Sequence, residues 1–473
     1  MNIDVHIFKK NEYVALYNSL TMDIAYIHNK DFINNSVSSD IEKLLPQEIA
    51  SHENYWLAIT DKLNNNLEPD ITTMYMFLNE NCNMYCTYCR YIHKLPADFS
   101  GKVMDIEHGK AQINKFLEWN KKEKKQKTIV FFGTEVLIHI DILKELILYT
   151  KILEERYKLD KTELLIFTNG LLLNEHIIKF LKTYHVVPII SIDGWKELHD
   201  KTRITRNGKG TFDVVQKNCK VMNNHSLKFG ISLAVGEHNI DFLPEIVEYF
   251  VKEFNPLNIG MNPMEINDKD KREIFFEKYI KKGIEAYKVA RELKISIPQI
   301  MRRIRPFIEK KHRIKECPTC GGAIRVYPTG RIGTCSHFVA VNEHCMSEKE
   351  FISTNFQKNE IIKTWSNRTQ FKFEECRNCE AISLCGGGCV YNAWLQNGSI
   401  MSPDYRICTH SRLALEWCIW ELFKTANGQE IIRKERVFIP NAKERKKIYG
   451  KLDEKTLRLP LQNYNTYGEQ KLT

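Results

Sequence analysis

The sequence lacks the marks of export and of membrane insertion. Its N-terminus has no positively charged segment followed by an apolar stretch and a small-residue cleavage site. No apolar run approaches the roughly 18 residues of a membrane-spanning helix. Internal repeats and low-complexity tracts are also missing. We therefore expect a cytoplasmic protein with no membrane partner, and its 473 residues predict two or three domains.

Cysteine, by contrast, is abundant, because the chain has 14 of them. In a reducing compartment, clustered cysteines more often bind metal or carry out redox chemistry than form disulfides. The formal net charge is +10, with dense basic stretches at Lys121–Lys127 and Arg433–Lys451. Such runs are usually solvated faces, so we do not expect nucleic acid as a partner.

The spacing of apolar residues predicts an α/β fold. From Ile71, apolar strands alternate with amphipathic helices, which is typical of βα units around a parallel sheet. Six units predict an open, partial (β/α)6 barrel with its site at the C-terminal ends of the strands. The predicted strands are Thr72–Leu78, Thr128–Phe132, Glu163–Phe167, Val186–Ile192, Lys228–Val235 and Leu257–Met261. The predicted helices are Asp105–Trp119, Ile142–Tyr157, Glu175–Tyr184, Phe212–Asn223, Phe242–Phe254 and Lys271–Leu293.

Composition divides the chain into four predicted parts. Residues 1–70 form a small hairpin-and-helix unit, and residues 71–299 form the barrel. Beyond Ile300 the alternation stops and most of the remaining cysteines appear, so residues 300–423 form a separate, cluster-binding domain. Residues 424–473 are a basic C-terminal tail. In the first part, the predicted strands are Val5–Phe8, Tyr13–Tyr17 and Ile24–Ile27, and the predicted helices are Ile41–Ile49 and Tyr55–Leu63.

Three cysteines, Cys82, Cys86 and Cys89, directly follow the first barrel strand. Three thiolates cannot saturate a four-iron cluster, whereas structural iron–sulfur sites normally use four cysteines. One iron is therefore left open for an outside ligand. The alternatives are a zinc site completed by His93, or chance.

The spacing CxxxCxxC, with the aromatic Tyr88 before the last cysteine, resembles the hallmark of the radical SAM superfamily. The resemblance implies that the open iron of a [4Fe–4S] cluster chelates S-adenosyl-L-methionine. An electron from the reduced cluster would then cleave that cofactor to methionine and a 5′-deoxyadenosyl radical. The protein would orient the cofactor and exclude water.

Further motifs stand at the ends of later predicted strands. Gly133-Thr134-Glu135-Val136 occupies the place of the family's GGEP motif, from which it departs at Thr134 and Val136. Thr168-Asn169-Gly170 and Ser191-Ile192-Asp193-Gly194, with Arg203 following, resemble the TNG and SxDG…HD..R patterns of the peptide- and protein-modifying branch. The residues that the resemblance implies as cofactor contacts are Tyr88, Gly133, Thr134, Glu135, Thr168, Asn169, Ser191, Asp193 and Arg203.

A second field of cysteines resembles the SPASM domain, which holds two auxiliary [4Fe–4S] clusters in its relatives. The resemblance implies an inner cluster on Cys320, Cys335 and Cys389, for which Cys317 can supply the fourth ligand. It implies an outer cluster on Cys376, Cys379, Cys385 and Cys408. Zinc is the alternative for Cys376–Cys408, because CxxC pairs serve zinc as readily as iron. Cys219, Cys345 and Cys418 fit no motif and are expected to be small buried apolar residues.

Substrates of SPASM proteins are mostly ribosomally made peptides or proteins, and anaerobic sulfatase maturases form one branch. In those maturases an aspartate directly follows the cysteine of the Gx4C segment and serves as the base. Here Ser336 and His337 follow Cys335, which argues against sulfatase maturation.

We therefore expect a peptide maturase that joins a cysteine sulfur to a carbon of a ribosomal precursor peptide through a thioether. The expected electron donor is a ferredoxin or flavodoxin. A maturase that forms carbon–carbon crosslinks or epimerises residues is the first alternative. A non-catalytic, cluster-bearing binding protein is disfavoured by the intact cysteine triad, and an RNA-modifying enzyme by the SPASM field. Residues 1–70 resemble a short leader-recognition element, although they could also merely cap the open barrel.

Overall fold

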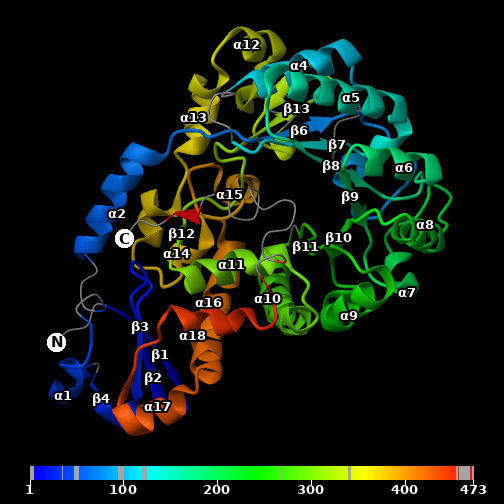
Figure 1. Cartoon of the computed structure of the whole chain (residues 1–473). Coiled ribbons are helices and arrows are strands. Elements are labelled where there is room, and N and C mark those ends of the chain that lie inside the picture. Colours follow the sequence, from blue (N-terminus) through cyan, green and yellow to red (C-terminus); the bar gives the residue numbers. More distant parts are fainter. Residues whose placement is uncertain are drawn as a thin grey trace.

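The structure of the chain is a computed structural model (Figure 1). It describes residues 5–34, 36–46, 49, 53–93, 101–119, 125–266, 268–338, 342–453, 456 and 469–470. The fold is α/β, as predicted, with one large sheet that carries the candidate site and a smaller sheet beside it. None of the helices in these described ranges is long and apolar enough to cross a membrane.

The large sheet has nine strands in the order β11-β10-β9-β8-β7-β6-β13-β14-β15. Its first six strands are parallel and follow one another in the chain, which confirms the predicted run of βα units. Those six are β6 (Thr73–Phe77), β7 (Thr128–Phe132), β8 (Glu163–Thr168), β9 (Val186–Ser191), β10 (Gly230–Val235) and β11 (Ile259–Pro263).

Amphipathic helices cover the outer face of these strands (Figure 1). In α4, for example, Asp105 caps the first turn by accepting a hydrogen bond from the backbone N–H of His108 at 3.0 Å. The helix then buries Ile113, Phe116 and Leu117, which recur at helical spacing on one face. The covering helices are α4 (Ile106–Glu118), α5 (Ile140–Tyr157), α6 (Glu175–Thr183), α8 (Phe212–Asn224), α9 (Leu243–Phe254) and α10 (Lys269–Glu292), with the short α3 (Arg90–His93) and α7 (Lys196–His199) near the strand ends.

The cysteine-rich region continues the same sheet. Strand β13 (Ala323–Val326) pairs in parallel with β6, with Arg325 opposite Tyr75. Strands β14 (Arg331–Gly333) and β15 (Cys345–Ser347) then extend the sheet in antiparallel fashion. The rest of the region is mainly short helices: α11 (Pro298–Glu309), α12 (Glu348–Ser353), α13 (Glu360–Ser366), α14 (Ile382–Cys385), α15 (Val390–Asn397) and the longer α16 (Tyr405–Thr425).

The small sheet joins the two ends of the chain. Its order is β1-β2-β3-β16, so β1 (His6–Lys10), β2 (Tyr13–Tyr17) and β3 (Ile24–His28) are completed by β16 (Val437–Phe438). Figure 1 shows the blue N-terminal strands beside the orange helix α17 (Gly428–Glu435). The smaller elements of the terminal regions are β4 (Phe32–Ile33), β5 (Ser36–Val37), α18 (Ala442–Lys446), β12 (His312–Arg313) and β17 (Glu469–Gln470).

Two details differ from the sequence-based expectation. The helix predicted at Ile41–Ile49 is seen only as α1 (Ser39–Glu42), and α2 (Glu53–Asn66) follows it. Pro46 disfavours helical geometry in the residue before it, and residues 47 and 48 lie outside the described ranges. The basic stretch Arg433–Lys451 is not uniformly solvated either, because Arg445 is buried and donates to the carbonyls of Phe307 and Met22 at 2.8 and 2.6 Å. Of the other stretch, residues 121–124 lie outside the described ranges.

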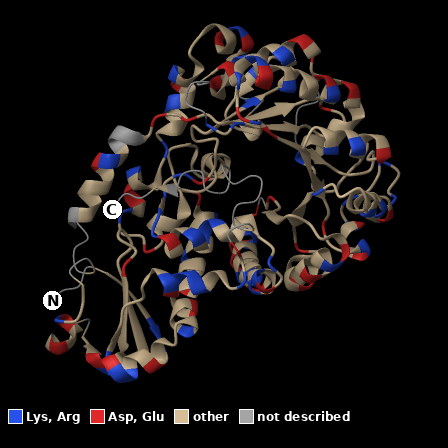
Figure 2. Cartoon of the chain, in the orientation of Figure 1, with Lys and Arg blue, Asp and Glu red and all other residues tan. Residues whose placement is uncertain are grey.

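Charges of both signs alternate over the outer helices (Figure 2). A blue segment, by contrast, marks α11 where it crosses the centre of the view, between the large sheet and the small one. Its arginines Arg302, Arg303 and Arg305 are buried. The interior therefore carries a local excess of positive charge beside the cysteine-rich region.

Candidate active site

A cavity of about 600 Å³ opens among the strand ends of the large sheet. Side chains from the interior of the strands form its floor, for example Tyr75, Phe132 and Phe167. Its volume is in the usual range for a ligand site. Ten of the predicted site residues line it: Cys82, Cys86, Tyr88, Cys89, Gly133, Thr134, Thr168, Asn169, Ser191 and Arg203.

The loop with Cys82, Cys86 and Cys89 is held by backbone pairing to the segment after α7. The N–H of Tyr85 donates to the carbonyl of Ile204 at 2.8 Å, and that of Thr87 donates to Thr202 at 3.0 Å. The Cys82 sulfur accepts the N–H of Met84 at 3.4 Å. The loop is thereby fixed although it contains little regular structure, so the three thiols stay together at the cavity.

Burial raises the pKa of all three thiols, that of Cys86 to about 12. Without a metal, these groups are therefore neutral at pH 7. A cluster would take them as thiolates, so its assembly would release protons. Three thiols on one wall of a cavity, with no fourth cysteine lining it, fit a four-iron cluster with one open iron.

Gly133 lies where the backbone of β7 passes close to the residue after β6. A Cβ added there would come within 2.9 Å of the Asn79 carbonyl oxygen, and φ is +155°. Only glycine fits this close approach. Thr134, which replaces the second glycine of the family motif, has a structural contact of its own: its hydroxyl donates to the carbonyl of Asn81, next to Cys82. Thr134 thus ties the end of β7 to the start of the cysteine loop.

Glu135 is fully buried, and its carboxylate joins two of the motifs. It accepts from the Thr168 hydroxyl and the Asn169 N–H, both at 2.7 Å, and from the Leu137 N–H at 3.0 Å. Asn169 in turn donates to the side chain of Asn83 at 2.8 Å, within the cysteine loop. These contacts bring the GTEV, TNG and cysteine motifs together. That Glu135 also touches the cofactor stays a prediction.

Asp193 is also fully buried and lies next to Tyr88 and Arg203. Its Oδ2 accepts from the Tyr88 hydroxyl at 2.8 Å and from Arg203 Nε at 2.7 Å. Its Oδ1 accepts the N–H of Ala234 at 2.9 Å. The three predicted contacts therefore form one hydrogen-bonded group, in which Asp193 orients the two residues that line the cavity.

The cysteines assigned to the outer cluster surround one small cavity. Cys376, Cys379, Cys385 and Cys408 all line it. The Cys385 sulfur accepts the N–H of Gly387 at 3.3 Å. Gly386, Gly387 and Gly388 all have positive φ, from +65° to +78°, which glycine adopts readily. The glycine run thus lets the backbone wrap around this group of thiols.

The cysteines assigned to the inner cluster form a second group. Cys317 is near enough to Cys320, Cys335 and Cys389 for their charges to interact. Burial raises the pKa of the Cys335 thiol to about 12. Cys317 is therefore a neighbour of the other three cysteines. Its role as a ligand stays a prediction.

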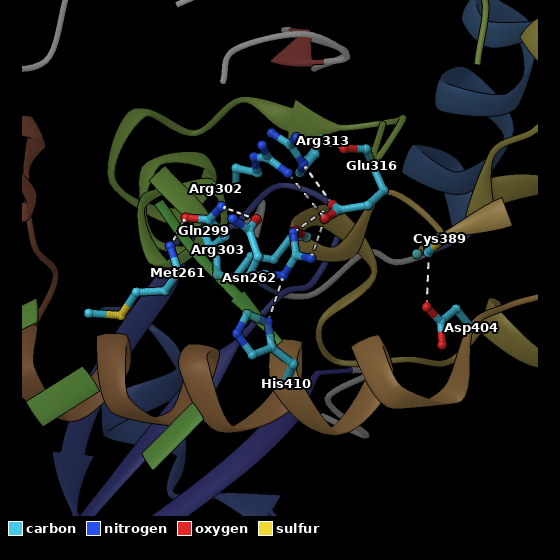
Figure 3. Close-up of polar contacts among 12 residues, drawn as sticks. Met261, Asn262, Gln299, Arg302, Arg303, Arg313, Glu316, Cys389, Asp404 and His410 are labelled. Carbon is cyan, nitrogen blue, oxygen red and sulfur yellow. Dashed lines mark hydrogen bonds and ion pairs between the residues drawn. The ribbon is translucent and has the colours of Figure 1, made fainter. Parts of the chain in front are cut away.

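Three buried arginines lie around one carboxylate, that of Glu316 (Figure 3). Glu316, directly before Cys317, accepts two hydrogen bonds of 2.8 Å from Arg303 and one of 3.1 Å from Arg313. Arg302 lies 3.8 Å away. Burial opposes ionisation, but Arg303 and its neighbours lower the pKa of Glu316 to about 2. Three guanidinium groups on one carboxylate leave a positive excess, which fits an anionic cluster beside it.

A single residue connects the two auxiliary groups. The N–H of Cys389 donates to Asp404 Oδ2 at 3.1 Å, as Figure 3 shows. The thiol of Cys408 contacts the backbone carbonyl of the same Asp404 at 3.8 Å. Arg406 neutralises this buried carboxylate at 2.8 Å. Of the three cysteines without a motif, Cys219 and Cys418 are fully buried, as expected, whereas Cys345 is only partly buried.

Sequence reasoning missed the part of the cavity lining that lies outside the predicted motifs. This part comes from β11, α11, β13 and the segment after Cys335. Its inward positions on the strands could have been found by alternation, as for Tyr75 on β6. The arginines and amides carry no such signal, because a buried polar residue looks like a surface one in a sequence. The missed polar residues are Asn258, Asn262, Gln299, Arg302 and Arg325.

Comparisons with known proteins agree with this site. Residues 76–250 match the family model of the radical SAM superfamily. A cysteine-type anaerobic sulfatase-maturating enzyme of Clostridium novyi is 26% identical, over 66% of this chain and 86% of its own. The radical SAM cyclopropyl synthase TigE of Paramaledivibacter caminithermalis is 23% identical, over 87% of this chain and 89% of its own.

Solved structures share the fold. The native anSMEcpe structure with bound AdoMet has a TM-score of 0.62 and 23% identity, covering 75% of this chain and 99% of its own. SuiB of Streptococcus suis bound to S-adenosylmethionine has a TM-score of 0.53 and 16% identity, covering 81% and 83%. Together with the cysteine triad on the cavity and the cysteine-rich C-terminal region, these likenesses support a radical SAM enzyme of the SPASM maturase type, which uses a [4Fe–4S] cluster and S-adenosylmethionine.

Proposed function

We propose that the enzyme modifies a ribosomally made precursor peptide and forms a thioether between a cysteine sulfur and a carbon atom. The observation that carries the proposal is that one cavity is lined both by the first cysteine field and by residues that lie close to the second field. Cys82, Cys86 and Cys89 line it, and so do Arg325 and His337, which lie ten residues before and two residues after Cys335 in the chain. A peptide in this cavity would lie between two redox centres.

Electron counting gives a reason for that arrangement. Joining a thiol to a C–H carbon removes one hydrogen atom, one proton and one electron from the peptide. When bound, S-adenosylmethionine and the first cluster supply the acceptor of the hydrogen atom. The remaining electron needs an acceptor close to the peptide, and the cysteines of the proposed inner cluster adjoin the cavity through Arg325.

The residues of this chain then have defined tasks in the proposal. Cys82, Cys86 and Cys89 hold the first cluster. Asp193 holds Tyr88 and Arg203 in place, and these two side chains contact the cofactor. The floor residues Phe132 and Phe167 are apolar and exclude water from the reacting atoms. The relatives support a peptide substrate, since anSMEcpe has been solved with the Cp18Cys peptide and SuiB with its precursor peptide SuiA. A ferredoxin or flavodoxin is the proposed electron donor.

Carbon–carbon bond formation is the second candidate, and the likeness to the cyclopropyl synthase TigE favours it. Mass spectrometry separates the possibilities after incubation of the reconstituted enzyme with a precursor peptide. A thioether removes two hydrogen atoms and makes one cysteine resistant to alkylation. A carbon–carbon crosslink removes two hydrogens but leaves every thiol reactive, and epimerisation leaves the mass unchanged. The thioether proposal fails if the product keeps all its reactive thiols.

A further inference from the structure

Among the described residues, four arginines and no Asp or Glu line the cavity. These arginines are Arg90, Arg203, Arg302 and Arg325. Three of them have a carboxylate nearby: Arg203 pairs with Asp193 at 2.7 Å, Arg90 lies 4.0 Å from Glu265, and Arg302 lies 3.8 Å from Glu316. Because Glu316 also serves Arg303 and Arg313, its charge is shared. The described lining of the cavity is therefore positive.

Arg325 differs from the other three. Among the described residues, no carboxylate lies within the 4.0 Å of an ion pair with it, although only 7% of the residue is exposed. Its Nη1 donates to the carbonyl of Thr334. Its guanidinium lies 4.5 Å from the centre of the Tyr75 ring, which fixes its plane. The edge with Nε and Nη2 has no hydrogen bond to the described part of the chain.

A buried guanidinium is costly without a nearby anion. An inner cluster on Cys335 and Cys317 would offset part of the Arg325 charge, whereas no carboxylate of the described residues does so. The free edge of Arg325 has the geometry that binds a carboxylate through two parallel hydrogen bonds, and its stacked plane is already oriented. Neutral donors and acceptors stand on the same wall, because Gln299 donates to Asn262 at 2.9 Å and accepts from the N–H of Met261 at 2.8 Å (Figure 3). These amides suit a peptide backbone beside the carboxylate.

We propose that Arg325, with Arg302 also on the lining of the cavity, forms a carboxylate-binding subsite of the substrate cavity. The peptide would carry an acidic group near the residue that is attacked, either an Asp or Glu side chain or its own C-terminus. The inference rests on the proposed peptide-modifying function and names the class of peptide that this cavity takes.

Binding of synthetic peptides to the reconstituted, S-adenosylmethionine-loaded enzyme tests the subsite without turnover. The probes are N-acetylated peptides with one cysteine: one with Glu beside it and an amidated C-terminus, one with Gln and an amidated C-terminus, and one with Gln and a free C-terminus. Calorimetry at millimolar peptide gives their affinities. We expect at least one acidic probe to bind about tenfold more tightly than the neutral one. Which one it is identifies the source of the carboxylate.

Variants of Arg325 show whether this arginine makes the difference. Arg325→Gln should remove the preference for the acidic probe, and Arg325→Lys should keep part of it, since an ammonium group cannot bind both oxygens in parallel. Arg433→Gln, on the exposed face of α17, is the matched control and should leave the preference unchanged.

Equal affinity of the wild-type enzyme for acidic and neutral probes overturns the subsite. A preference for the acidic probe that survives in Arg325→Gln also overturns it. If that variant loses iron and keeps the preference, the arginine serves the cluster and not the peptide. Product formation is a separate readout. A wild-type enzyme that crosslinks a precursor but shows no preference refutes only the subsite, whereas preference without any peptide product refutes only the maturase function.

Discussion

Asp193 and Arg203 form an ion pair of 2.7 Å between two side chains that are almost fully buried. The same carboxylate oxygen accepts the hydroxyl of Tyr88, the residue before Cys89. The pair therefore connects the strand end of β9 to the cysteine loop. Because ionic groups are costly to bury alone, each partner depends on the other.

Replacing Asp193 by Asn should leave the Arg203 charge without its partner. Breaking a buried pair typically costs about 3–5 kcal/mol. We expect Asp193→Asn to lower the free energy of unfolding by that order and to weaken S-adenosylmethionine binding. Asp241→Asn is the control, because its pair with Lys278 is half exposed and should contribute less than about 1 kcal/mol. Chemical denaturation measures the free energy of unfolding, and a binding assay measures the affinity for S-adenosylmethionine. Equal losses of stability and affinity in Asp193→Asn and Asp241→Asn would contradict the role proposed for the buried pair.

Iron content tests the assignment of the cysteines. The anaerobically reconstituted protein should hold on the order of twelve irons, as three four-iron clusters. Replacing Cys82, Cys86 and Cys89 together by Ala should remove about four of them and abolish reductive cleavage of S-adenosylmethionine, while the auxiliary clusters remain. Replacing Cys219, which is buried but outside both fields, is the control for thiol loss alone. Saturation near four irons together with zinc would refute the SPASM assignment.

The inner cluster should be ligated entirely by the protein. Cys317 lies with Cys320, Cys335 and Cys389, so no iron would be free to bind a substrate thiol, and electron transfer is the role that remains. Cys317→Ala should therefore change the electron paramagnetic resonance spectrum of one auxiliary cluster, whereas Cys345→Ala should not. An unchanged spectrum in Cys317→Ala would make direct ligation of a substrate thiol the better mechanism.

His199 predicts a loss of stability in acid. Burial lowers its pKa to about 4, and its Nδ1 accepts the N–H of Asp193 at 3.3 Å. Because the folded-state pKa lies below the unfolded value near 6.5, the neutral ring stabilises the fold above pH 6.5. This contribution, of the order of 2 kcal/mol, is lost as the pH falls towards 4. The free energy of unfolding should change less between pH 7 and pH 5 in His199→Gln than in the wild type. The control His108→Gln, at an exposed site, should behave as the wild type does.

The sequence was sufficient to predict the barrel strands and the grouping of cysteines, but not the short pairings. Strand β13 has four residues and β16 has two, and each pairs with a strand more than 200 residues away in the chain. Periodicity cannot reveal such contacts. Arg325 and Arg302 likewise resemble ordinary basic residues, and only the fold brings them to the cavity. The cysteine motifs were visible because their chemistry requires fixed spacing.

The last prediction concerns residues 1–70, for which leader binding and capping of the barrel are the two alternatives. Deleting the segment is a poor test, because Tyr26 donates to Ile419 at 2.6 Å and Arg445 to Met22, so the rest of the protein would lose buried partners. A more selective test uses β1, which is an edge strand of the small sheet. An extended leader could add to this edge as a further strand.

The register of the hairpin shows which residue to change. Lys10 faces Tyr13 across a two-residue turn, so these two form a hydrogen-bonded pair. By alternation, the N–H of Lys9 points to the free edge. Lys9→Pro therefore removes an edge donor and leaves the bonds between β1 and β2 in place. Lys9→Ala is its matched control, because it loses the same charge but keeps the N–H.

If the segment recognises a leader, Lys9→Pro should weaken binding of the precursor peptide by about tenfold or more and retain uncoupled cleavage of S-adenosylmethionine. Lys9→Ala should have a smaller effect, through its charge alone, because a basic edge favours an acidic leader. Fluorescence anisotropy of a labelled precursor measures binding, and 5′-deoxyadenosine formation measures cleavage. If both variants bind the precursor as the wild type does, the segment caps the barrel, and selectivity must come from the cavity with Arg325.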